Sequence, residues 1–151
     1  MYAPAGFISA HRHLRVMVTL KEITETLEMV NDDSHYFYDA ETDKIEYYSD
    51  HDDLDEEDHE RFENDRYIPL PNQFDLDGYE IMKDFCRSVD DQGKRDVLLT
   101  AIAGRGAFRA FRDFVRTFGM EEEWYAFRFA ELRKVAKYWC DKHKIEYSDT
   151  K

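Results

Sequence analysis

The sequence GRGAFRAFRDFVRTFGMEEEWYAFRF, residues 104–129, decides the fold that we expect for the second half of the chain. Phenylalanines recur in it at intervals of three and four residues, which is the spacing of one face of an α-helix. Gly119 follows them and favours the left-handed conformation that ends many helices. Residues 121–123 are all glutamate, and the dipole of a following helix favours negative charge at its start. The stretch therefore predicts a helix over residues 107–118 and a second one from about 121 to 142.

Two more helices are expected before this stretch. Asp77 and Glu80 fit a capping box, in which two side chains at a helix start accept hydrogen bonds from each other's backbone. Apolar residues at helical spacing follow over residues 79–86 and again over residues 97–102, with a break at residues 90–93.

The first part of the chain combines a helix with strands. Thr19 and Glu22 form another possible capping box, which predicts a helix that reaches to about Val30. Residues 35–39 and 44–49 are rich in Tyr, Phe and Ile and are separated by a short polar stretch, which is typical of a β-hairpin.

A third strand is expected over residues 66–70. Pro69 cannot donate a backbone hydrogen bond, so this strand belongs at a sheet edge or at a strand end. The run between the hairpin and this strand, residues 50–65, is acidic and nearly free of apolar side chains. Such a run cannot bury enough surface to offset the entropy of ordering it, and we expect a solvated loop.

These patterns predict an α+β fold: an N-terminal helix and a small antiparallel β-sheet with an acidic loop, followed by a bundle of about four helices. Residues 17–71 and 72–145 are expected to pack together as a single domain. Residues 1–16 contain no acid and precede a well-formed helix start. We expect them to be a disordered leader or extension.

Charge is distributed unevenly along the chain. Residues 31–65 carry 16 acids and two bases, which is a net charge of −14, whereas the whole chain has −13. This balance argues against a general affinity for nucleic acids or anionic membranes, although a local basic site remains compatible with it. No run approaches the roughly 18 apolar residues of a membrane span. Cys86 and Cys140 lie far apart in sequence and are expected to be reduced and buried, as in a cytoplasmic protein.

The arginines of the quoted stretch form the main candidate site. Arg105, Arg109, Arg112 and Arg116 fall within roughly 60° of one another on a helix. A guanidinium group can form paired hydrogen bonds to phosphate or carboxylate, so the stripe is a candidate binding face for an anionic partner. The alternative is internal, with the stripe paired to acids of neighbouring helices or of the acidic run. Arg128 falls within an apolar arc and needs a partner such as Glu131 or another acid, or else lines a pocket.

The acidic run is a second candidate. It could mimic nucleic acid and bind a basic protein through its clustered carboxylates, Asp52, Asp53, Asp55, Glu56, Glu57 and Asp58. His51 and His59 lie among them, but the spacing fits no known metal-binding loop. We expect no dedicated metal site, no cofactor and no catalytic residues, because the motifs of nucleophilic catalysis and of phosphate-binding loops are absent from the sequence.

Three functions remain open at this stage. The leading one is a non-enzymatic cytoplasmic interaction or regulatory protein that docks an anionic partner, either protein or nucleic acid, through the arginine stripe. The second is the nucleic-acid mimic. In the third, an enzyme or binder holds a small phosphorylated or carboxylated metabolite with Arg105, Arg109 and Arg128. The tyrosines of the hairpin also permit a homo-oligomer.

Several short motifs resemble those of a known family. They are YIPLP at residues 67–71, the stretch YEIMKDF at 79–85, GRGAFRAF at 104–111 and EEWYAFR at 122–128. The chain resembles a bacterial family of uncharacterised small proteins that share an acidic N-terminal region, the YIPLP segment and this helical half. The resemblance covers roughly residues 18–142 and implies a similar fold, without an activity, cofactor or site. Residues 1–16 fall outside it, which favours Met17 as a natural start.

Overall fold

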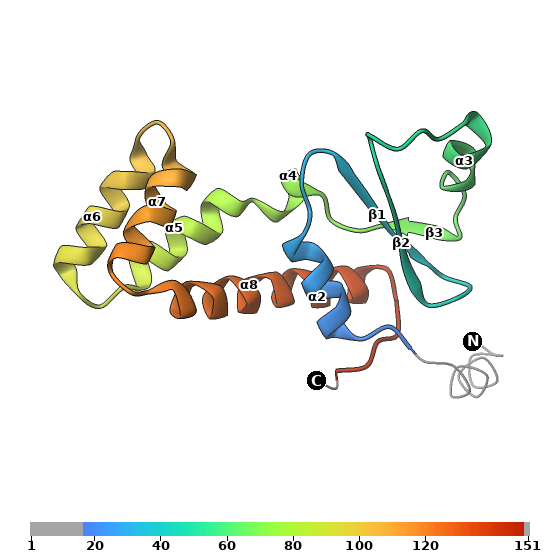
Figure 1. Ribbon diagram of the computed structural model, residues 1–151. Coiled ribbons are helices and arrows are strands. Elements are labelled where there is room, and N and C mark those ends of the chain that lie inside the picture. Colours follow the sequence, from blue (N-terminus) through green and yellow to red (C-terminus); the bar gives the residue numbers. More distant parts are fainter. Residues whose placement is uncertain (1–16, 150–151) are drawn as a thin grey trace.

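The computed structural model describes residues 17–149, so the expectation for residues 1–16 lies outside the described part of the chain. The fold is α+β, as predicted (Figure 1). Along the sequence, helices come both before and after the strands of a small antiparallel sheet. The long helix α8 (Glu121–Lys142) extends along the molecule. Near its start it packs against α5 (Gly78–Ser88) and α7 (Ala107–Thr117), and elsewhere it packs against α2 (Leu20–Glu28).

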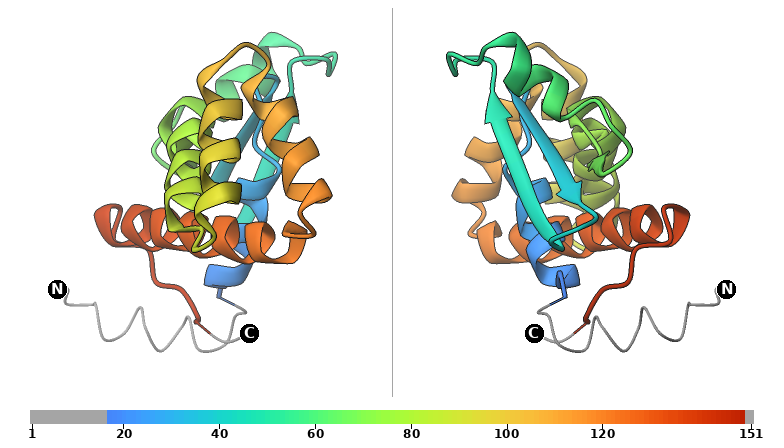
Figure 2. Two further views of the ribbon diagram at one scale, coloured as in Figure 1. Left: turned by 90° about the vertical axis from the view of Figure 1, so that its left-hand side faces the viewer. Right: turned by 90° about the vertical axis from the view of Figure 1, so that its right-hand side faces the viewer.

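The helical part of the molecule corresponds to the predicted bundle. Helix α6 (Gln92–Ala103) packs between α5 and α7, and Figure 2 shows the three side by side on one side of α8. Helix α7 ends at Gly119, whose φ of 67° is the left-handed conformation predicted there. The turn before α7 also needs a left-handed residue, which Gly106 supplies with a φ of 64°.

Helix α2 is held at its start by the predicted capping box. The backbone N–H of Glu22 donates to Oγ1 of Thr19 at 2.9 Å, and the backbone N–H of Thr19 donates to Oε1 of Glu22 at 3.2 Å. The same segment meets the other end of the described chain in a parallel bridge. Leu20 N–H donates to the carbonyl of Ser148 at 2.8 Å, and Ser148 N–H donates to the carbonyl of Val18 at 3.0 Å.

The sheet has the strand order β2-β1-β3, with β1 (Ser34–Asp39) in the middle. Strands β2 (Lys44–Ser49) and β3 (Tyr67–Pro69) flank it, both antiparallel. Pro69 therefore lies on an edge strand, as its missing N–H requires. Its carbonyl accepts a hydrogen bond from the indole N–H of Trp139 at 2.9 Å, which ties the sheet to α8.

The acidic run differs from the expected loop, because part of it is helical. Helix α3 (Glu56–Arg61) lies within it and is capped by Asp55, which accepts a hydrogen bond from the backbone N–H of Asp58 at 2.9 Å. The run is anchored by Phe62, whose ring stacks on that of Phe37 with centroids 4.7 Å apart. The contact of Phe62 with the sheet and the capped helix, which has acids at its N-terminus, offset the entropy lost when the run is ordered. The composition of the run alone did not indicate these contributions.

The short helix α4 (Gln73–Leu76) was not predicted. Its capping box is formed by Asn72 and Asp75. Asp77 follows it in a left-handed conformation with φ 47° and caps α5 by accepting from the N–H of Glu80 at 3.3 Å. Of the capping box predicted at Asp77 and Glu80, only the hydrogen bond to the side chain of Asp77 is present among the described hydrogen bonds. The backbone of Asp77 also ends α4.

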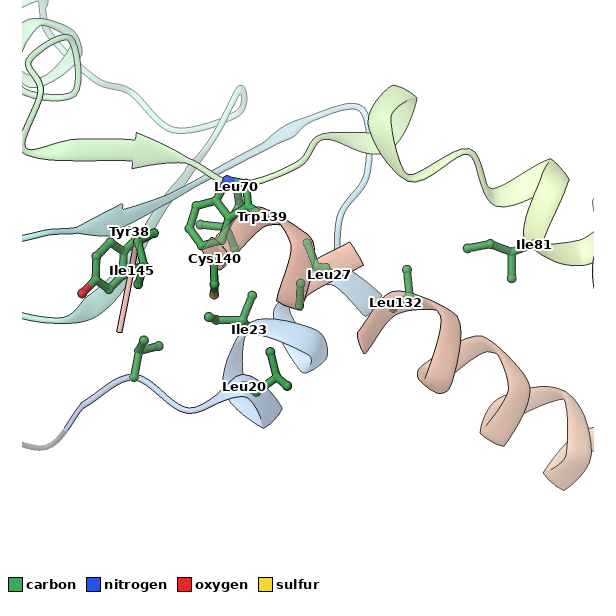
Figure 3. Close-up of a cluster of buried hydrophobic side chains, with 12 residues drawn as sticks. Leu20, Ile23, Leu27, Tyr38, Leu70, Ile81, Leu132, Trp139, Cys140 and Ile145 are labelled. Atoms are coloured by element: carbon green, nitrogen blue, oxygen red, sulfur yellow. The ribbon is translucent and has the colours of Figure 1, made fainter. Parts of the chain in front are cut away.

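Two clusters of buried side chains make the core. The first joins α2, the sheet and the second half of α8, and its members include Leu27, Tyr38 and Trp139 (Figure 3). The second joins α5, α6 and α7 around Phe85. Trp124 and Phe127 of α8 pack against both clusters, so one helix connects the two.

Both cysteines are buried free thiols, as predicted. Burial raises the pKa of Cys86 to about 11 and that of Cys140 to about 12, so both stay protonated at neutral pH. Among the residues that the structure describes, no helix is both long and apolar enough to cross a membrane.

The end of β1 carries a buried carboxylate. The side chain of Asp39 is 1% exposed and forms two hydrogen bonds of 2.8 Å with Nε and Nη2 of Arg66. It also accepts from the backbone N–H of Glu41 at 2.9 Å. The hydrogen bond from Arg66 is the main reason that the pKa of Asp39 lies far below its ordinary value. This pair connects the hairpin turn to the segment that leads into β3.

We expect Arg66→Met to lower the free energy of unfolding by about 2–3 kcal/mol. This is less than the roughly 3–5 kcal/mol for breaking a fully buried pair, because Arg66 is partly in water. Methionine keeps the packing of the stem, so the loss reports the charge. Arg87→Met, which removes an exposed pair with Asp84, serves as the control and should cost less than about 0.5 kcal/mol. Equal losses in urea titrations of the two variants would contradict this role of Arg66.

The pair of Asp39 and Arg66 also predicts that the free energy of unfolding decreases in acid. Because the folded state lowers the pKa of Asp39, its contribution is present above the unfolded pKa of about 3.9 and is lost as the pH falls below it. Asp39→Asn cannot titrate. The difference in unfolding free energy between the wild type and Asp39→Asn should therefore shrink between neutral pH and about pH 3. A difference that stays constant over this range would show that Asp39 is not held ionised by Arg66.

Candidate functional site

The predicted arginine stripe lies on the outer side of α7. Phe111 and Val115 of this helix are buried, which turns the arginines toward solvent. Arg105 lies in the turn before the helix, and all four side chains are exposed. We call Arg105, Arg109, Arg112 and Arg116 the arginine face. Helix α7 carries a single acid, Asp113, so the face has a net positive charge.

The arginine face is not neutralised by the rest of the molecule. Within residues 17–149, none of its four guanidinium groups has an ion pair within 4 Å or a side-chain hydrogen bond. Every other arginine in that range has a partner: Arg61 with Glu46, Arg66 with Asp39, Arg87 with Asp84, Arg95 with the carbonyl of Val89, Arg128 with Glu28, and Arg133 with Asp149. The internal pairing that the sequence left open is therefore not formed in the described part of the chain.

The acidic run, which we call the acidic arm (residues 50–65), lies far from the arginine face. Figure 1 shows α3 and α7 at opposite ends of the molecule. Two of the predicted carboxylates have structural roles, since Asp52 accepts from the N–H of Ser49 at 2.8 Å and Asp55 caps α3. Asp53, Glu56 and Glu57 point into solvent, and Asp58 is half-buried. The two charged regions thus remain separate surfaces.

A groove of about 1060 Å³ opens beside α7. It lies between the end of α2, the short α4, and helices α5, α7 and α8. Apolar side chains from four helices line its interior: Leu27, Ile81, Met82, Phe111 and Leu132. Arg112 and Arg128 also line it, so the groove is continuous with the arginine face at Arg112.

Exposed aromatic side chains gather at this groove. Phe74 is 90% exposed, Tyr125 59% and Phe108 55%, and all three line it. We call this site the aromatic groove. Large apolar side chains that cluster in water around a hollow are characteristic of interaction sites, whereas single ones scattered over a surface are ordinary. Sequence patterns did not indicate this site, because its residues come from segments that are far apart in the chain.

Arg128 pairs with an acid other than Glu131, which is one of the options that the sequence pattern left open, and it also lines the aromatic groove. It lies 3.7 Å from the carboxylate of Glu28, measured from Nη1 to Oε2, and donates to the carbonyl of Glu28 at 3.4 Å. Glu131 is instead paired with Lys134 at 2.8 Å. Arg128 therefore joins α8 to the end of α2 and holds one wall of the aromatic groove.

The three arginines proposed for a small metabolite do not all line the aromatic groove. Arg128 lines the aromatic groove, whereas Arg105 and Arg109 are not among its lining residues. In residues 17–149, no three His, Cys, Asp or Glu side chains are grouped as ligands for a metal ion. The charged face and the apolar hollow adjoin each other at Arg112.

Comparison with known proteins identifies the family. The model of Uncharacterised protein family UPF0158 matches residues 14–150, and the chain belongs to this family. The match extends beyond the motifs that first suggested a resemblance. No curated protein and no solved structure matches the chain.

Proposed function

We propose that this member of UPF0158 is a non-enzymatic cytoplasmic protein that docks an anionic partner through the arginine face. The observation that carries the proposal is that these four arginines alone lack partners among the described arginines of the chain. Unpaired guanidinium groups keep their hydrogen-bonding forks available for carboxylate or phosphate.

The overall negative charge of the chain does not oppose such docking at short range. Charges are screened over about 8 Å at physiological ionic strength, and α3 lies at the far end of the molecule from α7. A partner that approaches α7 is therefore largely screened from the charge of the acidic arm. The acidic arm instead limits indiscriminate binding of polyanions, because it contributes a repulsive field elsewhere on the surface.

The acidic arm supports a second candidate, the mimic of nucleic acid. Helix α3 presents Glu56 and Glu57 on an exposed surface, and Asp53 lies exposed just before the helix. An ordered array of carboxylates fits a basic partner with a smaller entropy loss than a flexible loop would.

Charge reversal at Arg109 and Arg116 tests the docking face, since neither residue lines the aromatic groove. We expect Arg109→Glu with Arg116→Glu to weaken binding to an anionic probe by at least about tenfold, from the loss of several charge contacts. Two probes of equal charge, a polyglutamate peptide and a single-stranded RNA, are titrated by fluorescence anisotropy over a salt series. If phosphate contacts contribute, the logarithm of the RNA binding constant falls linearly with the logarithm of salt concentration.

The matched control is Arg87→Glu with Arg133→Glu, which makes the same change in net charge at exposed arginines elsewhere. This control should bind either probe within about twofold of the wild type after the change in net charge is allowed for. Failure of both probes to bind at low salt, or an equal loss in the two double variants, would contradict the proposed role of the arginine face.

The mimic is tested by neutralising the acidic arm without disturbing its anchor. Deleting the arm would remove Phe62 and so perturb the sheet. Asp53→Asn, Glu56→Gln, Glu57→Gln and Asp58→Asn keep the cap at Asp55. We expect this variant to bind a polyarginine peptide at least about tenfold more weakly. The control neutralises four acids elsewhere, Asp90, Asp96, Glu122 and Glu123, and an equal loss there would leave only a net-charge effect.

A further inference from the structure

The aromatic groove has an apolar interior and an exposed apolar rim. Ile81, Met82, Phe111 and Leu132 are each less than 10% exposed, so the interior is a wall of the packed core. Phe74 and Tyr125 stand at the rim with most of their surfaces in water. A partner with large apolar side chains would cover both, and burial of that surface favours association.

The charged side chains around the groove differ in whether they already have partners within the protein. On one wall, Asp75 and Asp77 accept hydrogen bonds from the N–H groups of Asn72 and Glu80, at 3.1 and 3.3 Å, in their capping roles. On the opposite wall, Arg112 has no described partner, and Arg128 is held in place by Glu28. The α7 side of the groove is therefore positive where it meets the arginine face, whereas Asp32, Asp75 and Asp77 make the other side negative.

The groove is large enough to take several side chains of a polypeptide. Its volume of about 1060 Å³ lies at or above the upper end of pockets for small ligands, which hold roughly 300–1,000 Å³. A groove with walls from several helices can accept side chains spaced at i, i+3 or i+4, and i+7 from one face of a helix.

We propose that the aromatic groove binds an acidic amphipathic helix of a partner protein, with its apolar side chains against Phe74, Phe108 and Tyr125 and a carboxylate on Arg112. This inference rests on the proposed docking function and names the chemistry of the partner. The remaining arginines of the face, which lie outside the groove, then pair with further acids along the polar side of the same helix.

Nucleic acid fits this groove less well. Asp32, Asp75 and Asp77 line it and would repel a phosphate backbone. A peptide avoids this repulsion, because its apolar side chains carry no obligatory charge and its acids can be confined to the α7 side.

The experiment is a selection of helix-forming peptides from a display library with randomised positions, carried out on the full chain. We expect the enriched peptides to share large apolar residues at i, i+3 or i+4, and i+7, together with Asp or Glu on one flank. The most enriched peptide is then synthesised and its affinity is measured by fluorescence anisotropy.

Two double variants, each with two aromatic residues changed to serine, locate the bound peptide. Phe74→Ser with Tyr125→Ser removes the rim and should weaken binding at least about tenfold, as expected for central aromatic contacts. Tyr47→Ser with Tyr138→Ser removes aromatics that are 57% and 69% exposed but lie outside the groove. That control should bind within about twofold of the wild type. Arg112→Gln should weaken binding about three- to tenfold, with a smaller effect in high salt.

Changes in the methyl NMR signals of Ile81, Met82 and Leu132 on addition of the peptide would support the groove as its site. Enriched peptides without an apolar pattern, equal affinities of the two double variants, or the same NMR changes caused by RNA or by self-association would overturn the inference. The proposed function can survive that result. It fails separately, if reversal at Arg109 and Arg116 leaves the binding of the anionic probes unchanged.

Discussion

Helix α8 has to bury apolar side chains along its whole length of 22 residues, about 33 Å, and the two ends of the helix do so against different layers. Near its start, Trp124 and Phe127 pack against the cluster around Phe85. Near its end, Trp139 packs edge to face with Tyr38 and donates to the carbonyl of Pro69. The sheet and the α5–α7 helices share few direct contacts, so their relative placement depends on this helix. The aromatic groove lies where the two layers meet on α8.

Much of the fold follows from local patterns in the sequence. The cap at Thr19, the helix end at Gly119 and the edge position of Pro69 each result from the chemistry of a few adjacent residues, and the structure confirms them. Other features depend on residues far apart in the chain. The partner of Arg128 is Glu28, a hundred positions away, whereas the nearer Glu131 is taken by Lys134. Local spacing cannot choose between two such acids, because the choice depends on how α2 crosses α8.

The candidate site likewise has one part that local spacing predicts and another that depends on residues far apart in the chain. The arginine face could be predicted, since helical spacing places its members together whatever α7 packs against. Whether those arginines have partners could not be predicted from the sequence, because this depends on which acids the fold brings near them. Of the groove, the sequence indicated Arg112 and Arg128, but its aromatic rim was missed. Phe74, Phe108 and Tyr125 belong to three helices, and in the sequence each resembles an ordinary core residue. The role of Phe62 was also missed. A single aromatic residue in an acidic run gave no sign that it would anchor the run to the sheet.

The bridge between Thr19 and Ser148 gives the fold a mechanical property. The two segments run parallel there, and the hydrogen bonds Leu20 to Ser148 and Ser148 to Val18 lie across them. A force that pulls residues 17 and 149 apart therefore acts along both segments and strains the two bonds at the same time, in shear. They cannot open one after the other, as they would in a hairpin pulled from its open end. This pair of bonds between irregular segments thus shields α2 and α8 from tension applied between residues 17 and 149.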